Sequence, residues 1–178
     1  MDFGFNPASK DEPIVFGARR PGHNSRSVSL ESVLRWIEFM KSRGIKRVVC
    51  LLPKSQLDYY EGIPGGLLKL YNNEFGEENV LSAPVEDFHL PEPNKLKQIL
   101  DFLKNSDKMK EKVVVHCSGG LGRTGVVLAA WLAHGRGLSE KEALEAVIAT
   151  GRNPYEAVEC GNATEEDLKA LLTIKSID

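Results

Sequence analysis

Hydrophobic positions along the chain follow two periodicities, one typical of buried strands and one of amphipathic helices. Short apolar runs rich in β-branched or aromatic residues and ended by proline, glycine or polar residues predict strands at 3–5, 13–17, 45–52, 79–85 and 112–116. Between these runs, apolar residues recur every three or four positions, which predicts helices. The alternation of strands and helices predicts an α/β fold with a central, mostly parallel sheet of about five strands and helices on both faces.

Local start and stop residues set the expected helix boundaries. In the first half, we expect a helix from Leu30 to Met40, capped by Ser27 or Ser29 and ended by Gly44, and an ambiguous stretch over 57–75 in which Pro64 fits a helix start. In the second half, we expect a helix opened by Pro93, one over 123–134 ended by Gly135, one from the Ser139–Glu142 capping box to Thr150, and a last one from Thr164 and Asp167.

Length and charge narrow the class of protein. With 178 residues, 42% of them hydrophobic and 27% charged, the chain is expected to fold as one domain spanning 1–178. The net charge of −2 gives no overall positive field, so we expect neither a nucleic acid nor a membrane as partner. The longest apolar run, 126–133, is too short to span a bilayer, and the N-terminus lacks the apolar core of a signal peptide. We therefore expect a monomeric cytoplasmic protein.

The cysteines do not form a recognisable framework. Cys50, Cys117 and Cys160 are odd in number and widely spaced, which argues against both a set of disulfides and a zinc site. We expect no metal and no other cofactor. Cys50 lies within an apolar strand, so a buried structural thiol is the simpler interpretation, and a redox pair with Cys117 is the alternative.

The segment 116–125 carries the clearest chemical signal. Its glycines let the backbone curl with N–H groups pointing inward, and the following helix adds the positive end of its dipole, which together form a cradle for an anion. A thiol there is favoured as thiolate, so Cys117 is a candidate nucleophile. Arg123 can offer two parallel donors to a phosphate, Thr124 can donate its hydroxyl to the Cys117 sulfur, and His116 can hold the loop. The expected phosphate-binding residues are Ser118, Gly119, Gly120, Leu121, Gly122 and Arg123.

A second motif overlaps this segment. Residues 120–125 also match the G-x-G-x-x-G pattern of dinucleotide-binding proteins, placed after a strand and at the start of a helix. That fold needs a further parallel strand after the helix, with an acidic residue about 20 positions on for the ribose. Here the sequence continues as helices, so dinucleotide binding is disfavoured.

The segment 116–125 resembles the signature loop of cysteine-dependent protein tyrosine and dual-specificity phosphatases. Its neutral Gly-Gly-Leu-Gly-Arg form is similar to that of cyclin-dependent-kinase-associated phosphatases and small archaeal tyrosine phosphatases. The stretch 3–22 is similar to the entry strands of the family, and 84–91 to its general-acid loop. The resemblance therefore implies the cysteine-dependent phosphatase fold over most of the chain.

The resemblance also implies roles for residues outside the loop. Asp87 corresponds to the catalytic acid, with Glu86 and His89 as competing candidates nearby. Arg152 belongs to a segment, 152–159, whose arginine supports the signature loop in the family.

Other candidate site residues rest on weaker signals. The family often places a glutamine near the catalytic water, but this chain has Gly-Asn-Ala at 161–163, which leaves Asn162 as a candidate for positioning the water. Lys54 could touch Asp87 from the rim of the site, or it could be a solvated lysine. Arg19, Arg20 and Arg26 could attract an acidic substrate, or they could be ordinary surface charge.

Together these residues imply metal-independent hydrolysis of phosphate monoesters on a phosphorylated protein through a phosphocysteine intermediate. Phosphotyrosine is the expected substrate, with phosphoserine and phosphothreonine as further ones. The alternatives are an RNA 5′-triphosphatase, an inositol phosphate or phosphoinositide phosphatase, and a catalytically idle module that binds phosphoproteins. The neutral loop offers no extra cation for the first two. The presence of Cys117, Arg123 and Asp87 argues against the idle module, because binding alone needs no nucleophile.

Overall fold

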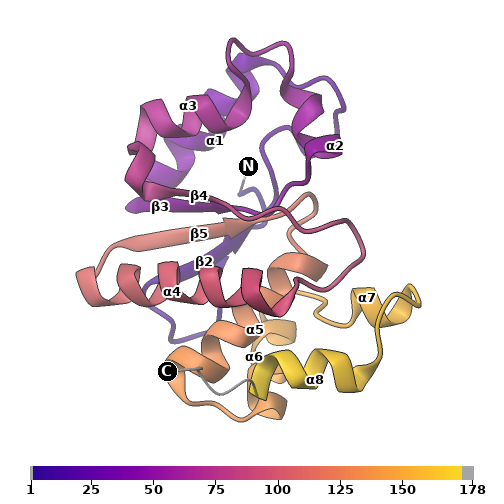
Figure 1. The fold of residues 1–178 in the computed structure, drawn as a ribbon. Coiled ribbons are helices and arrows are strands. Elements are labelled where there is room, and N and C mark those ends of the chain that lie inside the picture. Colours follow the sequence, from indigo (N-terminus) through magenta and orange to yellow (C-terminus); the bar gives the residue numbers. More distant parts are fainter. Residues whose placement is uncertain (1, 174–178) are drawn as a thin grey trace.

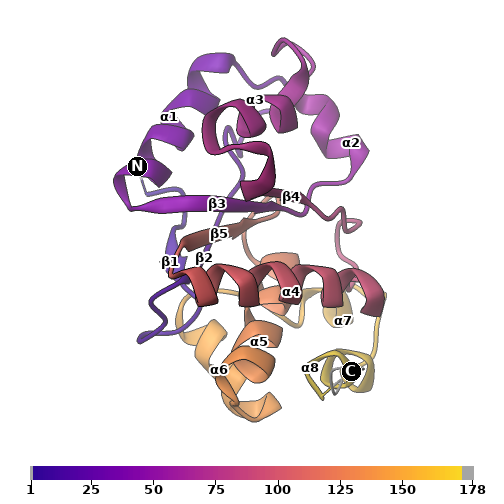
Figure 2. The ribbon, with the colours of Figure 1, turned by 60° about the vertical axis from the view of Figure 1, so that its left-hand side comes forward.

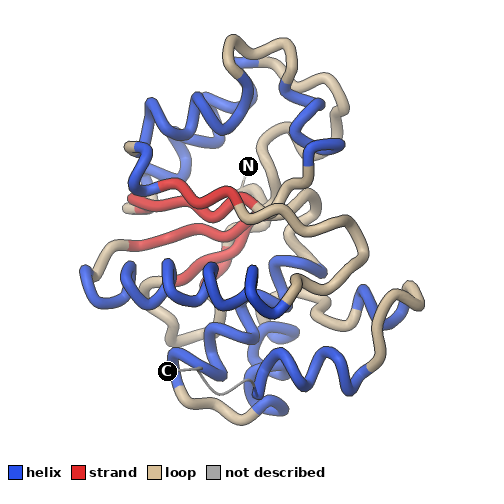
Figure 3. The backbone as a smooth tube through the Cα atoms, viewed as in Figure 1, coloured by secondary structure: helices blue, strands red, loops and turns tan. Residues whose placement is uncertain are grey.

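A five-stranded sheet forms the centre of the computed structural model, which describes residues 2–173 (Figure 3). Its strands are β1 (Asn6–Pro7), β2 (Val15–Ala18), β3 (Ile45–Cys50), β4 (Val80–Ser82) and β5 (Lys112–His116). Their order in the sheet is β1-β2-β5-β3-β4, and all neighbours are parallel except the antiparallel pair β1 and β2. The expected mostly parallel sheet is therefore confirmed.

Helices cover both faces of this sheet, as the α/β prediction requires (Figures 1 and 2). On one face lie α1 (Leu30–Ser42), α2 (Lys54–Leu57), the 3₁₀ turns η1 (Asp58–Tyr60) and η2 (Glu77–Asn79), and α3 (Gly66–Phe75). On the other lie α4 (Pro93–Met109), α5 (Gly122–Arg136), α6 (Glu140–Ala149), α7 (Glu156–Glu159) and α8 (Glu165–Thr173). Within the part of the chain that the structure describes, no helix is long and apolar enough to cross a membrane.

The position of β5 in the middle of the sheet explains why three apolar residues, Val113, Val114 and Val115, follow one another in it. Val113 and Val115 belong to a hydrophobic cluster with α4, α5, α6 and α8, whereas Val114 belongs to a second cluster with α1 and α3. Successive side chains of a strand point to opposite faces, so a strand covered on both sides needs an apolar residue at every position.

The N-terminal strand begins later than the sequence predicts. The expected strand over 3–5 is wrong, because Phe3 and Gly4 have φ angles of 54° and 61° and form a turn. The carboxylate of Asp2 accepts a hydrogen bond from the Gly4 N–H at 2.9 Å and stabilises this turn. The antiparallel strand is instead the short β1, and Phe5 stacks on the Phe16 ring of β2.

Two helix boundaries also differ from those expected. α5 continues past Gly135 and ends at Arg136, and Gly137, with a φ of 71°, takes the left-handed position after it. Gly135 instead gives room to the Trp131 ring, because a Cβ there would lie 2.5 Å from it. The ambiguous stretch resolves into η1 and α3, and α3 follows Gly65 at a φ of 78° and does not start at Pro64.

The parallel strands bring distant segments together at one edge of the sheet. The chain leaves β3, β4 and β5 at their carboxyl ends, where the loops 51–53, 83–92 and 117–121 follow. Backbone hydrogen bonds tie these loops to one another: Leu51 N–H donates to the His116 carbonyl at 2.9 Å, and Val85 N–H donates to the Leu51 carbonyl at 3.0 Å. This edge of the sheet carries the candidate site, as expected for an open α/β sheet.

Candidate active site

The loop 117–121 forms a concave cradle of backbone N–H groups. The Ser118 carbonyl faces outward, where it accepts hydrogen bonds from the Arg20 N–H at 3.0 Å and from His23 Nδ1 at 3.1 Å. No acceptor within residues 2–173 receives the amide N–H groups of 118–121. The first amides of α5 are unpaired as well, since the first turn of any helix lacks intrahelical acceptors. The cradle is therefore built to receive an anion.

Arg152 holds the back of this cradle. It is buried, and its guanidinium donates to the carbonyls of Gly120 at 2.6 Å, Gly17 at 2.9 Å and Gly4 at 2.9 Å. Gly120 itself has a φ of 71°, and a Cβ there would lie 2.6 Å from the Ala18 carbonyl oxygen. Only glycine fits this position without moving the end of β2.

Cys117 lies at the floor of a cavity of about 200 Å³ that opens above the cradle. The residue is only 2% exposed, and Thr124 Oγ1 donates a hydrogen bond to its sulfur at 3.1 Å. Asp87, Phe88 and Glu156 line the same cavity. The sulfur therefore faces the space in which an anion held by the cradle would lie.

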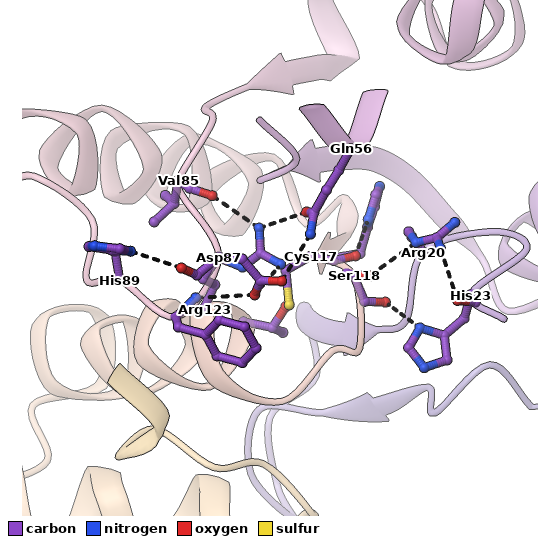
Figure 4. Close-up of polar contacts among 12 residues, drawn as sticks. Arg20, His23, Gln56, Val85, Asp87, His89, Cys117, Ser118 and Arg123 are labelled. Carbon is purple, nitrogen blue, oxygen red and sulfur yellow. Dashed lines mark hydrogen bonds and ion pairs between the residues drawn. The ribbon is translucent and has the colours of Figure 1, made fainter. Parts of the chain in front are cut away.

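Arg123 spans the cradle and the loop that follows β4 (Figure 4). Its Nη1 donates to Gln56 Oε1 at 2.9 Å and to the Val85 carbonyl at 3.0 Å, and its Nη2 lies 2.9 Å from Asp87 Oδ1. The buried Nε has no hydrogen-bond partner among the described residues. One edge of the guanidinium is thus anchored, while a strong donor is left unsatisfied for a ligand.

Asp87 is the residue of the 83–92 loop that reaches the cavity. Glu86 is exposed, and the ring of His89 lies on the outer side of the loop, where its Nδ1 donates to the Asp87 carbonyl at 2.8 Å (Figure 4). Phe88, next to Asp87, has a φ of 61°, and its exposed ring stands at the mouth of the cavity.

His116 is buried beneath the loop and is held in one tautomer. Burial lowers its pKa to about 4, with smaller contributions in the same direction from Arg123 and Arg20, so the ring is neutral at pH 7. A carbonyl can only accept, so Nδ1 donates to the Cys117 carbonyl at 3.0 Å and Nε2 accepts from the Tyr71 hydroxyl at 3.0 Å. The ring thereby fixes the start of the cradle.

Gln56, and not Lys54, is the residue of α2 that contacts Asp87. The Lys54 ammonium pairs with Asp58 at 2.8 Å and its side chain is 88% exposed, so Lys54 is the solvated lysine that the sequence allowed, and it does not contact Asp87. The buried Gln56 donates to Asp87 Oδ2 at 3.0 Å while it accepts from Arg123. No motif marks this glutamine, and its only signal in the sequence is its place shortly after a buried strand.

The cavity is lined by Glu156 and not by Asn162, the residue that was a candidate for positioning the water. Asn162 lies outside the cavity and donates to the Phe88 carbonyl at 2.9 Å, which ties the segment after α7 to the loop 83–92. Glu156, which the sequence does not single out, lines the cavity instead. It is the first residue of the unexpected short helix α7.

The remaining candidate residues lie apart from the cavity or serve the fold. Arg20 is buried and donates to Ser118 Oγ at 3.0 Å and to the carbonyl groups of its own loop, so it is not a surface charge.

Cys50 belongs to the hydrophobic cluster on the opposite face of the sheet from Cys117, and burial raises its pKa to about 12. Cys160 is exposed. Within 2–173, no three His, Cys, Asp or Glu side chains are grouped as metal ligands.

Comparison with known proteins places this geometry among phosphatases. A family model described as a DSP-PTPase phosphatase of polymorphic toxin systems matches residues 25–136. The uncharacterized protein MJECL20 of Methanocaldococcus jannaschii is 38% identical over 91 residues, which make up 48% of this chain and 52% of that protein. The matches to three curated relatives span between 6% and 52% of the lengths of those proteins.

Two solved structures share the fold over nearly the whole chain. Tk-PTP in its active form is 29% identical with a TM-score of 0.64, and the match covers 92% of this chain and 97% of that one. Kinase associated phosphatase with its catalytic-site cysteine replaced by serine has a TM-score of 0.66 at 22% identity, covering 89% and 83% of the two chains. The second match supports the fold alone.

Proposed function

The chain belongs to the dual-specificity and tyrosine phosphatase family, and from this membership we propose that residues 1–178 form one phosphatase domain that hydrolyses phosphate monoesters on proteins. The substrates are phosphotyrosine and, in second place, phosphoserine and phosphothreonine. The reaction proceeds through a phosphocysteine intermediate on Cys117. The observation that carries this proposal is the position of the Cys117 sulfur on the floor of a cavity lined by unpaired N–H groups and by Arg123.

The cradle supplies the electrostatic part of the reaction. The amides of 118–121 and the free Nε of Arg123 bind the oxygens of the phosphate, and they hold the phosphorus in line with the sulfur. The thiolate attacks, the S–P bond forms and the bond to the leaving oxygen breaks. Thr124 Oγ1, 3.1 Å from the sulfur, stabilises the thiolate when it departs again in the second step.

The leaving oxygen needs a proton, which a carboxyl group on the cavity wall can supply. The family resemblance assigns this step to Asp87. Asp87 and Glu156 both line the cavity, so two carboxyl groups are available. In the second step the carboxylate that gave the proton takes one back from the water molecule that hydrolyses the phosphocysteine.

The mouth of the cavity favours an aromatic substrate. Phe88 and Leu121 stand there with exposed fractions of 45% and 43%, although large apolar side chains are usually covered. Cys117 lines the same cavity and is only 2% exposed, so it lies deeper than these two residues. A tyrosine ring can pack between these side chains while its phosphate reaches the floor, whereas a phosphoserine has a shorter reach.

Phosphate release from matched peptides tests the proposal. Phosphotyrosine and phosphothreonine peptides and a 5′-triphosphorylated RNA are offered with chelator present, to the wild type and to Cys117→Ser. We expect release from the phosphotyrosine peptide to be fastest, and release to be lost in the variant. Wild-type release from the RNA alone would assign the RNA 5′-triphosphatase reaction. With folding verified, absence of release from all three would overturn the proposal.

A further inference from the structure

A second cavity lies beside the one that holds Cys117. It has a volume of about 250 Å³, and His23 lines both cavities, so this residue forms part of the wall between them. His23 and Arg20 lie on the other side of Cys117 from Asp87 (Figure 4). The second cavity is therefore placed to receive a side chain near the phosphorylated residue of a bound peptide.

Three arginines line this second cavity, which we call the arginine pocket: Arg19, Arg20 and Arg35. Asp2 is the one carboxylate among the described lining residues, so the arginines outnumber it. An excess of positive charge in a hollow of the surface raises the local concentration of anions. The composition of the arginine pocket thus favours an anionic ligand.

Arg20 brings to this pocket a buried positive charge that no carboxylate neutralises. The residue is 3% exposed, and its guanidinium donates to neutral acceptors, namely the hydroxyl groups of Ser118 and Tyr60 and the backbone carbonyls of its own loop. Within residues 2–173, no Asp or Glu side chain is hydrogen-bonded to it. Because a buried charge is costly unless an opposite charge comes near, Arg20 favours an anion in the adjoining pocket.

The other two arginines have guanidinium groups that a ligand can use. The backbone of Arg19 is fixed, since its N–H donates to the Phe3 carbonyl at 2.8 Å and its carbonyl accepts from Trp36 Nε1 at 2.9 Å. Its side chain is exposed, and no acceptor within residues 2–173 receives its guanidinium. Arg35 pairs with Glu31 of its own helix, but the two side chains are 71% and 73% exposed, and such surface pairs contribute little.

The positive charge of the arginine pocket also acts on the wall that it shares with the Cys117 cavity. Burial lowers the pKa of His23, and the charges of Arg20 and Arg19 lower it further, while the hydrogen bond to the Ser118 carbonyl opposes this. A potential that disfavours a proton on His23 attracts an anion to the same place.

We propose that the arginine pocket binds an anionic side chain of the substrate, a carboxylate or a second phosphate, that lies near the phosphorylated residue in the peptide. This inference rests on the phosphatase function proposed above and narrows its substrates to a class of peptides. Arg19 and Arg35 donate to the anion. Arg20 adds its charge and holds the wall, because it donates to Ser118 Oγ and to the His23 carbonyl. No bond forms or breaks in the pocket, so its effect is on kcat/KM through binding.

A peptide scan tests this binding. Phosphotyrosine peptides carry a single glutamate, or glutamine in its place, at each nearby position before and after the phosphotyrosine. We expect kcat/KM to be about fivefold higher for glutamate than for glutamine, but at one or two positions only, because a pocket has a fixed place whereas a diffuse field does not. An equal preference for glutamate at every position, or a preference at none, would overturn the proposal.

A third peptide series identifies the source of the anion. Phosphoserine replaces glutamate at the preferred position, and the appearance of the unphosphorylated tyrosine is followed by its fluorescence. A faster reaction with phosphoserine than with glutamate assigns the pocket to a second phosphate. A faster reaction with glutamate assigns it to a carboxylate.

Variants of the pocket are compared by the ratio of kcat/KM for the glutamate peptide to that for the glutamine peptide, so the fraction of folded protein cancels. Arg19→Gln combined with Arg35→Gln should lower this ratio below about twofold. Asp2→Asn removes the carboxylate and keeps an oxygen for the Gly4 N–H, so it should raise the ratio. Arg26→Gln is the matched control, because Arg26 is exposed in the same loop and lines neither cavity. An equal fall of the ratio in Arg26→Gln and in the double variant would contradict the pocket.

The same peptides separate the failure of this inference from the failure of the proposed function. Absence of phosphate release from every phosphotyrosine peptide would remove both. Release that is equally fast with glutamate and glutamine at every position would remove the arginine pocket alone and leave the phosphatase reaction in place.

Discussion

The Asp87 carboxylate lies 2.9 Å from Nη2 of Arg123, so the loop after β4 is bonded directly to the residue that spans the cradle of backbone N–H groups at 117–121. Arg123 adds a second bond to this loop through the Val85 carbonyl at 3.0 Å. The loop and the cradle, which are separated by about 30 residues in the sequence, therefore form one hydrogen-bonded unit. Gln56 completes the unit from a third segment, because it contacts both Asp87 and Arg123.

Replacing Gln56 by alanine tests whether this unit matters for catalysis. The Gln56→Ala variant leaves Arg123 Nη1 with one acceptor fewer and frees one oxygen of Asp87, so both side chains should lose order. We expect kcat/KM to fall at least about tenfold, since loss of a buried hydrogen bond to a charged group costs roughly 1.5–3 kcal/mol and 1.4 kcal/mol is a tenfold change. Steady-state kinetics on a phosphotyrosine peptide provides the measurement.

Lys54 offers the matched control for this prediction. It lies on the same short helix as Gln56, but its ammonium faces solvent and pairs only with Asp58. Lys54→Ala should change kcat/KM less than twofold. If the two variants lose activity equally, then the helix as a whole matters and the bridging role of Gln56 is contradicted.

Gly120→Ala should destabilise the fold, and much more than Gly62→Ala. A side chain at Gly120 meets the Ala18 carbonyl at 2.6 Å and must adopt a φ of 71°, while a Cβ at Gly62 meets nothing within 4 Å. The left-handed conformation alone costs about 1–2 kcal/mol, so we expect Gly120→Ala to lower the free energy of unfolding by about 2 kcal/mol or more. Urea denaturation of both variants measures it. Equal midpoints would show that the loop can relax away from β2.

The stability of the protein should depend on pH through His116. Its pKa is about 4 in the folded state and near 6.5 when unfolded, so the unfolded chain binds an extra proton between these values. The contribution of the neutral ring is therefore fully present above pH 6.5 and is lost as pH falls from 6.5 toward 4. The free energy of unfolding, measured in urea across this range, should fall more steeply for the wild type than for His116→Gln. A constant difference between the two proteins would contradict this assignment.

Much of the site can be predicted from the sequence because its central part is local. The strand, the loop and the start of the helix over 112–136 carry Cys117 and Arg123 within seven residues, and glycine positions and residue types suffice to indicate an anion cradle. The sheet follows from apolar runs that must be buried on both faces. The predicted capping box at Ser139 is also local, because it joins residues three positions apart. It is confirmed, since the Ser139 side chain accepts a hydrogen bond from the Glu142 N–H.

The rest depends on contacts between distant segments, which leave no periodic signal. Gln56 and Glu156 are polar residues of short helices, and only the packing of α2 and α7 against the carboxyl edge of the sheet brings them to the cavity. Lys54, on the same short helix as Gln56, is directed toward solvent, in agreement with the alternative of a solvated lysine. The predicted strand at 3–5 is wrong for a local reason. Its composition is apolar and favours a strand, but the chain forms a turn there that Asp2 stabilises.

A trapped intermediate tests the central claim most directly. A phosphotyrosine peptide labelled at its phosphate is mixed with the protein, the reaction is stopped within the first turnover, and the protein is digested and its labelled fragment identified by mass spectrometry. The account predicts the label on the fragment that contains Cys117, with none on Cys117→Ser and normal labelling of Cys50→Ser. Label on another residue, or full phosphate release by Cys117→Ser, would contradict it.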